Sequence, residues 1–141
     1  MKPNLIINGA GGRMGRRILA LAVESEDFDI VGAIERPQHP DLGKDAGSLA
    51  GIGEINVMVE SEPPDSADVM IDFSLPEATD RVVDHCVANN IGLVIGTTGL
   101  DARQLGRIRD ASSGIAVIQA TNMSVGMNIP VSYTHLTLPT N

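Results

Sequence analysis

Short apolar runs alternate with amphipathic segments along the chain. In the first amphipathic segment, from Arg13 to Glu26, Met14, Ile18, Leu21 and Ala22 recur at helical spacing. Continuous Val and Ile runs with helices between them predict a parallel sheet covered on both faces. The pattern therefore predicts a doubly wound, Rossmann-type α/β fold, with a mostly parallel sheet and helices on both faces. The predicted strands are 5–8, 28–35, 55–59, 69–73, 92–96 and 115–120.

Two later helices carry start signals. Ser74 with Glu77 three residues on reads as a capping box, and Pro76 suits a first turn, where no amide donor is needed. Asp101 with Gln104 repeats this logic. The buried faces expected for the two helices are Val82, Val83, Cys86 and Val87 in the first, and Leu105 and Ile108 in the second.

A glycine-rich loop joins the first strand to the first helix. The glycines are Gly9, Gly11, Gly12 and Gly15, a spacing closer to G-x-x-G-x-x-G than to the common G-x-G-x-x-G. Such a loop is either a plain tight turn or the floor of a dinucleotide site, where helix-start amides bind the diphosphate. Glu35 ends the second strand at the position where a ribose hydroxyl is read. This context favours the dinucleotide site, with Arg13 or its neighbours adding charge.

Other candidate residues follow the later strands. Glu35 and Arg36 favour different cofactors, because a carboxylate suits the free ribose of NAD and a guanidinium suits the extra phosphate of NADP. Alternatively, Arg36 is only a solvated charge. The runs IDFS (71–74) and GTTG (96–99) end later strands, at the edge of the sheet where ligands bind. The alternative for each run by itself is a structural role, with Ser74 as a helix cap and GTTG as a turn. We interpret Asp72 as a structural hydrogen-bond acceptor and Cys86 as a core residue. His39 and His85 have no metal-ligand partner at useful spacing, so no metal site is expected.

Composition narrows the class of protein. With 141 residues, 43% of them hydrophobic and only 2% aromatic, the chain suits one domain with an aliphatic core. A formal net charge of -8 argues against a broad nucleic-acid surface, and a single cysteine excludes an internal disulfide. No apolar run is long enough to cross a bilayer, and the first residues lack a signal-peptide core, so we expect a cytoplasmic protein without a membrane partner.

Six stretches in order carry a family resemblance: NGAGGRMGRR, GAIERP, DAGSLAG, VMIDFSLPEA, VIGTTGL and ATNMSVGMN. They resemble 4-hydroxy-tetrahydrodipicolinate reductase, an enzyme of the diaminopimelate route to lysine, from about residue 4 to about residue 129. The resemblance implies an NADH or NADPH site, hydride transfer to a cyclic dicarboxylate, and a homotetrameric parent. Phe73 and Ser74 would lie near the nicotinamide. The other site residues that it implies are Gly9, Ala10, Gly11, Gly12, Arg13, Met14, Glu35, Arg36, Gly96, Thr97, Thr98, Ala120, Thr121, Asn122 and Met123.

The end of the chain departs from this family. Members continue into a substrate domain with a His-His motif and a Lys-x-Asp-x-Pro-Ser-Gly segment, neither of which is present here. The run VSYTHLTLPTN resembles a translated sequencing adapter, so we expect a nucleotide-binding domain at 1–130 and a non-native tail at 131–141. Such a fragment is expected to lack catalytic residues and to be inactive by itself. Two alternatives remain open: another two-domain NAD(P) oxidoreductase, such as aspartate or homoserine dehydrogenase, and a nucleotide-sensing module without chemistry.

Overall fold

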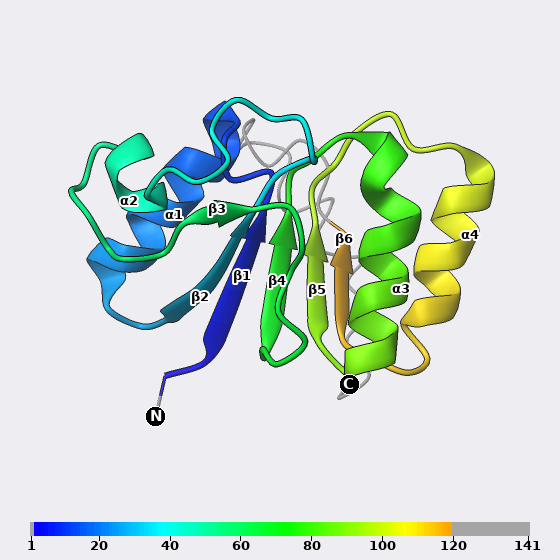
Figure 1. The fold of residues 1–141 in the computed structure, drawn as a ribbon. Helices are drawn as coiled ribbons and strands as arrows, with labels where there is room; N and C mark the ends of the chain where they lie inside the picture. The colour runs from blue at the N-terminus through cyan, green and yellow to red at the C-terminus, as the bar shows by residue number, and fades with distance from the viewer. Residues whose placement is uncertain (1, 120–141) are drawn as a thin grey trace, which may run out of the picture.

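The apolar runs of the sequence form one open sheet of parallel strands (Figure 1). The computed structural model describes residues 2–119. Within them the strand order is β3-β2-β1-β4-β5-β6, and every neighbouring pair is parallel. The order reverses between β1 and β4, which confirms the predicted doubly wound fold. The strands are β1 (Asn4–Asn8), β2 (Asp29–Ile34), β3 (Val59–Glu60), β4 (Val69–Asp72), β5 (Gly92–Ile95) and β6 (Val117–Gln119).

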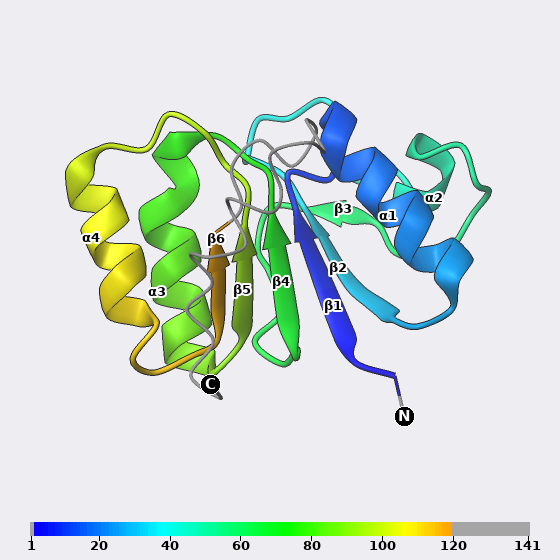
Figure 2. The same cartoon turned by 180° about the vertical axis from the view of Figure 1, so that it is seen from behind.

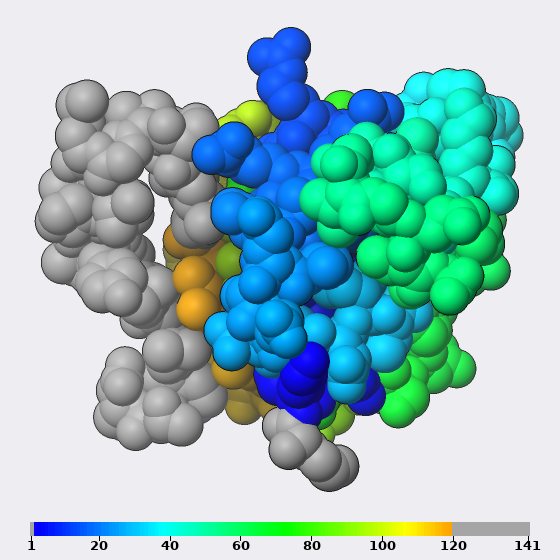
Figure 3. Space-filling model, turned by 90° about the vertical axis from the view of Figure 1, so that its left-hand side faces the viewer, coloured from blue at the N-terminus to red at the C-terminus, as the bar shows by residue number. Residues whose placement is uncertain are grey.

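Helices cover both faces of the sheet. On one face lie α1 (Arg13–Ser25) and the short α2 (Ala46–Leu49), and on the other lie α3 (Thr79–Asn89) and α4 (Ala102–Ala111) (Figures 1 and 2). The first two helices contact each other, and both lie at the surface in the side view of Figure 3. No helix within residues 2–119 combines the length and the apolar character needed to cross a membrane.

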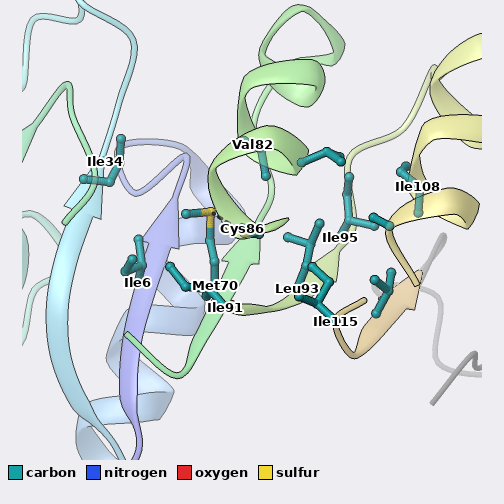
Figure 4. Close-up of a cluster of buried hydrophobic side chains, with 13 residues drawn as sticks. Ile6, Ile34, Met70, Val82, Cys86, Ile91, Leu93, Ile95, Ile108 and Ile115 are labelled. Atoms are coloured by element: carbon teal, nitrogen blue, oxygen red, sulfur yellow. Dashed lines mark hydrogen bonds between the residues drawn. The ribbon is translucent and has the colours of Figure 1, made fainter. Parts of the chain in front are cut away.

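Successive side chains of the buried strands point to opposite faces of the sheet and belong to two separate apolar cores. Leu5 and Ile7 of β1 belong to the core under α1, whereas Ile6 between them belongs to the core under α3 and α4. All three are 0% exposed, and fully burying a side chain of this size stabilises a fold by about 1.5–3 kcal/mol. Figure 4 shows the second core, in which Met70 of β4 meets Cys86 of α3.

Two residues expected on buried helix faces are exposed instead. Leu21 of α1 is 54% exposed and Val87 of α3 is 47% exposed. The stripe of α1 that faces the sheet runs through Gly15, Leu19 and Ala22, so Leu21 falls outside it. The other predicted positions of α3, Val82, Val83 and Cys86, are buried as expected.

Only one of the two predicted capping boxes forms. Asp101 accepts the N–H of Gln104 at 2.8 Å, and the Gln104 side chain accepts the N–H of Asp101 at 3.1 Å. The segment after β4 instead begins as a 3₁₀ turn, η1 (Pro76–Ala78), without a side-chain cap. The prediction for Ser74 was wrong because its hydroxyl donates to Asp72 at 2.5 Å and is not turned toward the helix.

The predicted strand at 55–59 is also mostly wrong. Only Val59 of that run pairs with β2. Asp45, at the start of α2, accepts the N–H groups of Ile55 and Asn56, and Asn56 has φ +63°. Backbone held by a side chain in this way cannot join a strand ladder.

Some predictions lie outside the described residues. They are the domain limit at residue 130, the tail at 131–141 and the site residues Ala120, Thr121, Asn122 and Met123.

Candidate functional site

The glycine loop is drawn tightly against the sheet. Gly9 has φ +86°, and a Cβ at this position would lie 2.5 Å from the Phe73 carbonyl oxygen. A Cβ at Gly15, in the first turn of α1, would overlap the Gly9 carbonyl. These two glycines therefore allow the loop to pass close to β4 and the helix to pass close to the loop.

Most amides of the loop are used inside the protein. The N–H groups of Gly9 and Ala10 both donate to the Ile34 carbonyl, at 2.8 and 3.1 Å, and the N–H of Gly12 donates to the Gly9 carbonyl at 3.0 Å. The N–H groups of Arg13 and Met14 have no acceptor within residues 2–119. A helix start with amides that have no acceptor among the described residues is thus present, and these amides belong to Arg13 and Met14 and not to the preceding glycines.

Glu35 lies against the loop, as its position after β2 predicts. Its Oε2 accepts the N–H of Gly11 at 2.8 Å, and its Oε1 accepts the N–H of Arg36 at 3.3 Å. The Glu35 side chain is 10% exposed, whereas Arg36 is exposed. The carboxylate therefore lies against the glycine loop that precedes α1, and Oε1 retains accepting capacity for a further donor.

Asp72 connects the ends of three strands. It is 0% exposed and accepts from Asn8 Nδ2 at 2.9 Å, Thr97 Oγ1 at 3.0 Å, and both the N–H and the hydroxyl of Ser74. Burial raises the pKa of this carboxyl, and the hydrogen bonds from Ser74, Thr97 and Asn8 act in the opposite direction. The geometry supports the interpretation of Asp72 as a structural acceptor.

Phe73 is held between the glycine loop and the GTTG run. Its N–H donates to the Asn8 carbonyl at 3.0 Å, and its ring lies so close to Gly96 that any Cβ there would overlap it. Thr97 is buried and Thr98 is exposed. The structure therefore brings the predicted residues 73–74 and 96–97 together at the carboxyl edge of the sheet, next to Asn8.

A cleft of about 650 Å³ opens along this edge, a volume within the usual range of small-molecule sites. Of the predicted site residues, those lining it are Gly9, Gly12, Glu35, Arg36, Phe73 and Ser74. The segment 61–63 and the exposed side of α3 form the opposite wall. Ala10, Gly11, Arg13, Met14, Gly96, Thr97 and Thr98 are not part of the lining.

Four residues that the sequence analysis did not assign to the site also lie there. Asn8 and His39 line the cleft, and Arg16 and Asp41 bond to each other at 3.2 Å behind the loop. A polar residue ending a buried strand was the available signal for Asn8. Nothing in the local pattern indicates that residues 36–44 fold back onto the glycine loop.

Comparisons with known proteins identify the family of this chain. A family model described as "Dihydrodipicolinate reductase, N-terminus" matches residues 3–123. A 4-hydroxy-tetrahydrodipicolinate reductase from Syntrophotalea carbinolica is 40% identical over 125 residues, which cover 86% of this chain and 47% of that protein. The chain spans about half the length of the curated relatives it matches.

Solved structures extend the likeness to the fold. A dipicolinate-bound dihydrodipicolinate reductase from Paenisporosarcina sp. TG-14 has a TM-score of 0.66 at 22% identity, covering 92% of this chain and 51% of that one. An aspartate semialdehyde dehydrogenase from Candida albicans, solved with NADP, has a TM-score of 0.65 at 14% identity, covering 94% and 46%. Identities this low show the fold alone, so the assignment depends on the family model, which confirms the resemblance found in the sequence. The chain belongs to the family of dihydrodipicolinate reductase N-terminal domains.

Proposed function

We propose that this chain is the NAD(P)H-binding half of a 4-hydroxy-tetrahydrodipicolinate reductase. The observation that carries the proposal is that the amides of Arg13 and Met14 have no acceptor within the described residues, while the Glu35 carboxylate lies against the same glycine loop. Amides at a helix start donate hydrogen bonds to a diphosphate, and a carboxylate accepts hydrogen bonds from ribose hydroxyls. Glu35 and Gly12 line the cleft, at the edge of the sheet where the strand order reverses, and Arg13 and Met14 follow directly after Gly12 in the chain.

The remaining site residues complete the proposal. The diphosphate would lie over Gly12, Arg13 and Met14, with the ribose of the adenosine at Glu35 and Arg36. The nicotinamide end would lie toward Phe73, Ser74 and the segment 96–98, and residues 120–123 are proposed from the family resemblance alone. Either NADH or NADPH is proposed as the cofactor.

When bound, the dinucleotide supplies a hydride, and the residues of this chain bind and orient it. For the whole parent protein we propose reduction of a cyclic dicarboxylate in the synthesis of diaminopimelate and lysine, by a cytoplasmic homotetramer. Hydride transfer requires donor and acceptor to be held at reacting distance. For these 141 residues we therefore propose nucleotide binding without turnover.

Fluorescence titration with NADH tests the binding claim. Gly12 is exposed, has φ -80°, and its Cβ would meet nothing closer than 3.4 Å, so Gly12→Val should fold while placing a branched side chain over the diphosphate position. The matched control is Gly114→Val, in the exposed turn before β6, where a Cβ would lie 3.8 Å from its nearest neighbour.

We expect the wild type and Gly114→Val to bind NADH with the same dissociation constant, and Gly12→Val to bind about tenfold more weakly or worse, a loss of roughly 1.4 kcal/mol. Circular dichroism checks that all three are folded. A well-folded wild type without a saturable signal would remove the proposal, as would equal affinities for the two valine variants.

A further inference from the structure

Charged side chains hold the peptide groups on both sides of Gly11. The Gly11 N–H donates to Glu35 Oε2 at 2.8 Å, and the Gly11 carbonyl accepts from Arg16 Nε at 3.0 Å. Arg16 also bonds to Asp41 at 3.2 Å, and Asp41 bonds to Lys44 at 3.3 Å. The segment 36–44 is thereby fastened to the middle of the glycine loop.

His39 closes the space directly over Gly11. A Cβ at Gly11 would lie 2.6 Å from His39 Cε1 and 2.9 Å from Nε2, and the His39 side chain is only 12% exposed. His39 Nδ1 accepts the N–H of Asp41 at 3.1 Å. That bond requires Nδ1 to be without hydrogen, so the neutral ring carries its proton on Nε2.

The protonated nitrogen of this ring faces Glu35. Nε2 lies 3.9 Å from Glu35 Oε2, and the other charged group facing the ring, Asp41, has Oδ2 at 3.7 Å from Nδ1. The Gly11 amide and the His39 imidazole thus both lie near Oε2 of the Glu35 carboxylate.

The position of this carboxylate decides which nucleotide fits. A ribose hydroxyl donates to a carboxylate, whereas a phosphate monoester brings a charge of about -1.5 to -2 toward it. Arg36 is exposed beside Glu35 and attracts a phosphate, but a fixed carboxylate opposes it. Discrimination against NADPH therefore depends on how firmly Glu35 is held.

We propose that His39 is a positioning residue that holds Glu35 against the glycine loop and thereby makes the site prefer NADH to NADPH. The inference rests on the proposed function, because it places the ribose of the adenosine at Glu35. His39 itself needs no contact with the nucleotide.

Three substitutions separate this role from a structural role of the loop. In His39→Asn, Oδ1 can still accept the Asp41 N–H, but the side chain is too short to reach Glu35. In His39→Gln, the longer amide can place an N–H where Nε2 stands. His39→Ala removes both contacts. The dissociation constants of NADH and NADPH are measured by titration calorimetry on the full 141-residue chain and on each variant.

The ratio of the NADPH to the NADH dissociation constant should fall about fivefold or more in His39→Asn and His39→Ala, and return toward the wild-type ratio in His39→Gln. An unchanged ratio in His39→Asn, with both nucleotides bound, overturns the inference and leaves the proposed function intact. Equal shifts in the Asn and Gln variants overturn it as well. If the folded wild type binds neither nucleotide, the proposed function fails and this inference fails with it.

Discussion

Replacing Asp72 by alanine would test the hydrogen-bonded connection between the strand ends. The carboxylate is 0% exposed and accepts from Asn8 Nδ2, Thr97 Oγ1, and the N–H and hydroxyl of Ser74. Asp72→Ala removes every one of these acceptors at once. The Asn8 amide keeps only a 3.4 Å contact with Ser74 Oγ, and Thr97 Oγ1 loses its bond within a buried site.

The expected loss of stability follows from the donors left without a partner. Each buried donor without an acceptor costs about 1–3 kcal/mol, and removing the buried charge itself recovers part of this. We therefore expect Asp72→Ala to lower the free energy of unfolding by about 3–5 kcal/mol. Single domains have only about 5–15 kcal/mol in total, so a large fraction of the variant would unfold at low urea concentration.

Asp72→Asn is the matched control. Its amide oxygen can accept from Asn8 and Ser74, and its NH₂ can donate to Thr97 Oγ1, whose hydroxyl rotates to accept. Urea unfolding followed by circular dichroism should place its midpoint near that of the wild type at neutral pH. Asp72→Ala should unfold at a much lower urea concentration than either.

The stabilities of the wild type and Asp72→Asn should differ by an amount that depends on pH. Burial raises the pKa of Asp72 in the folded state above its ordinary value of 3.8, against the opposing hydrogen bonds. A group with a raised folded-state pKa stabilises the fold below 3.8, and this contribution is lost as pH rises through the folded-state pKa. The free energy of unfolding of Asp72→Asn, minus that of the wild type, should therefore increase with pH across this window. A difference that does not change with pH, or equal urea midpoints for the Ala and Asn variants, would refute the reasoning.

Three further predictions concern other parts of the fold. Gly15→Ala should lower the free energy of unfolding by about 1–3 kcal/mol, because the added methyl would overlap the Gly9 carbonyl. Gly106→Ala in α4 should raise it by roughly 0.5–1 kcal/mol, because the space around Gly106 is open. Thermal melts that show the same sign for both variants would contradict this. Burial, with a smaller effect of the Asp72 charge, raises the pKa of the Cys86 thiol to about 12, so alkylation at pH 8 should proceed only as urea unfolds the chain, and fast alkylation of folded protein would count against it. Asp101→Ala removes the cap of α4 and should cost about 1 kcal/mol in the same urea assay, where an unchanged midpoint would show the cap to be dispensable.

The strands of the sheet centre could be predicted from the sequence because each is a closed apolar run. The predicted 69–73 and 92–96 differ from β4 and β5 by one residue at the carboxyl end. The run 55–59 is also mostly apolar, yet only Val59 joins the sheet, because Asp45 accepts the N–H groups of Ile55 and Asn56 from ten and eleven residues away and Met58 forms an isolated antiparallel bridge with Asp45. A bond of that kind leaves no trace in local periodicity.

The site residues whose place follows from the order of the strands could be predicted from the sequence. Glu35 contacts the glycine loop because the loop follows β1 and Glu35 follows the neighbouring β2. The partners of Ser74 and His39 were not predictable in this way. Ser74 has two competing kinds of partner near it in sequence. Its hydroxyl could accept an N–H of a helix start, but in the structure it donates to the strand-end carboxylate of Asp72. The placement of His39 depends on Asp41 and Arg16, which lies more than twenty residues earlier in the chain.

The carboxylate of Asp72 accepts hydrogen bonds from Asn8 of β1 and from Thr97, which follows β5, and the bond from Asn8 crosses the line between β1 and β4 where the two halves of the sheet meet. A ligand lying across that line would rest on a surface already fixed before it arrives. Preorganisation of this kind reduces the entropy lost on binding, and affinity then depends less on how many contacts the ligand makes. A small domain with few aromatic side chains can in this way hold a long, flexible molecule.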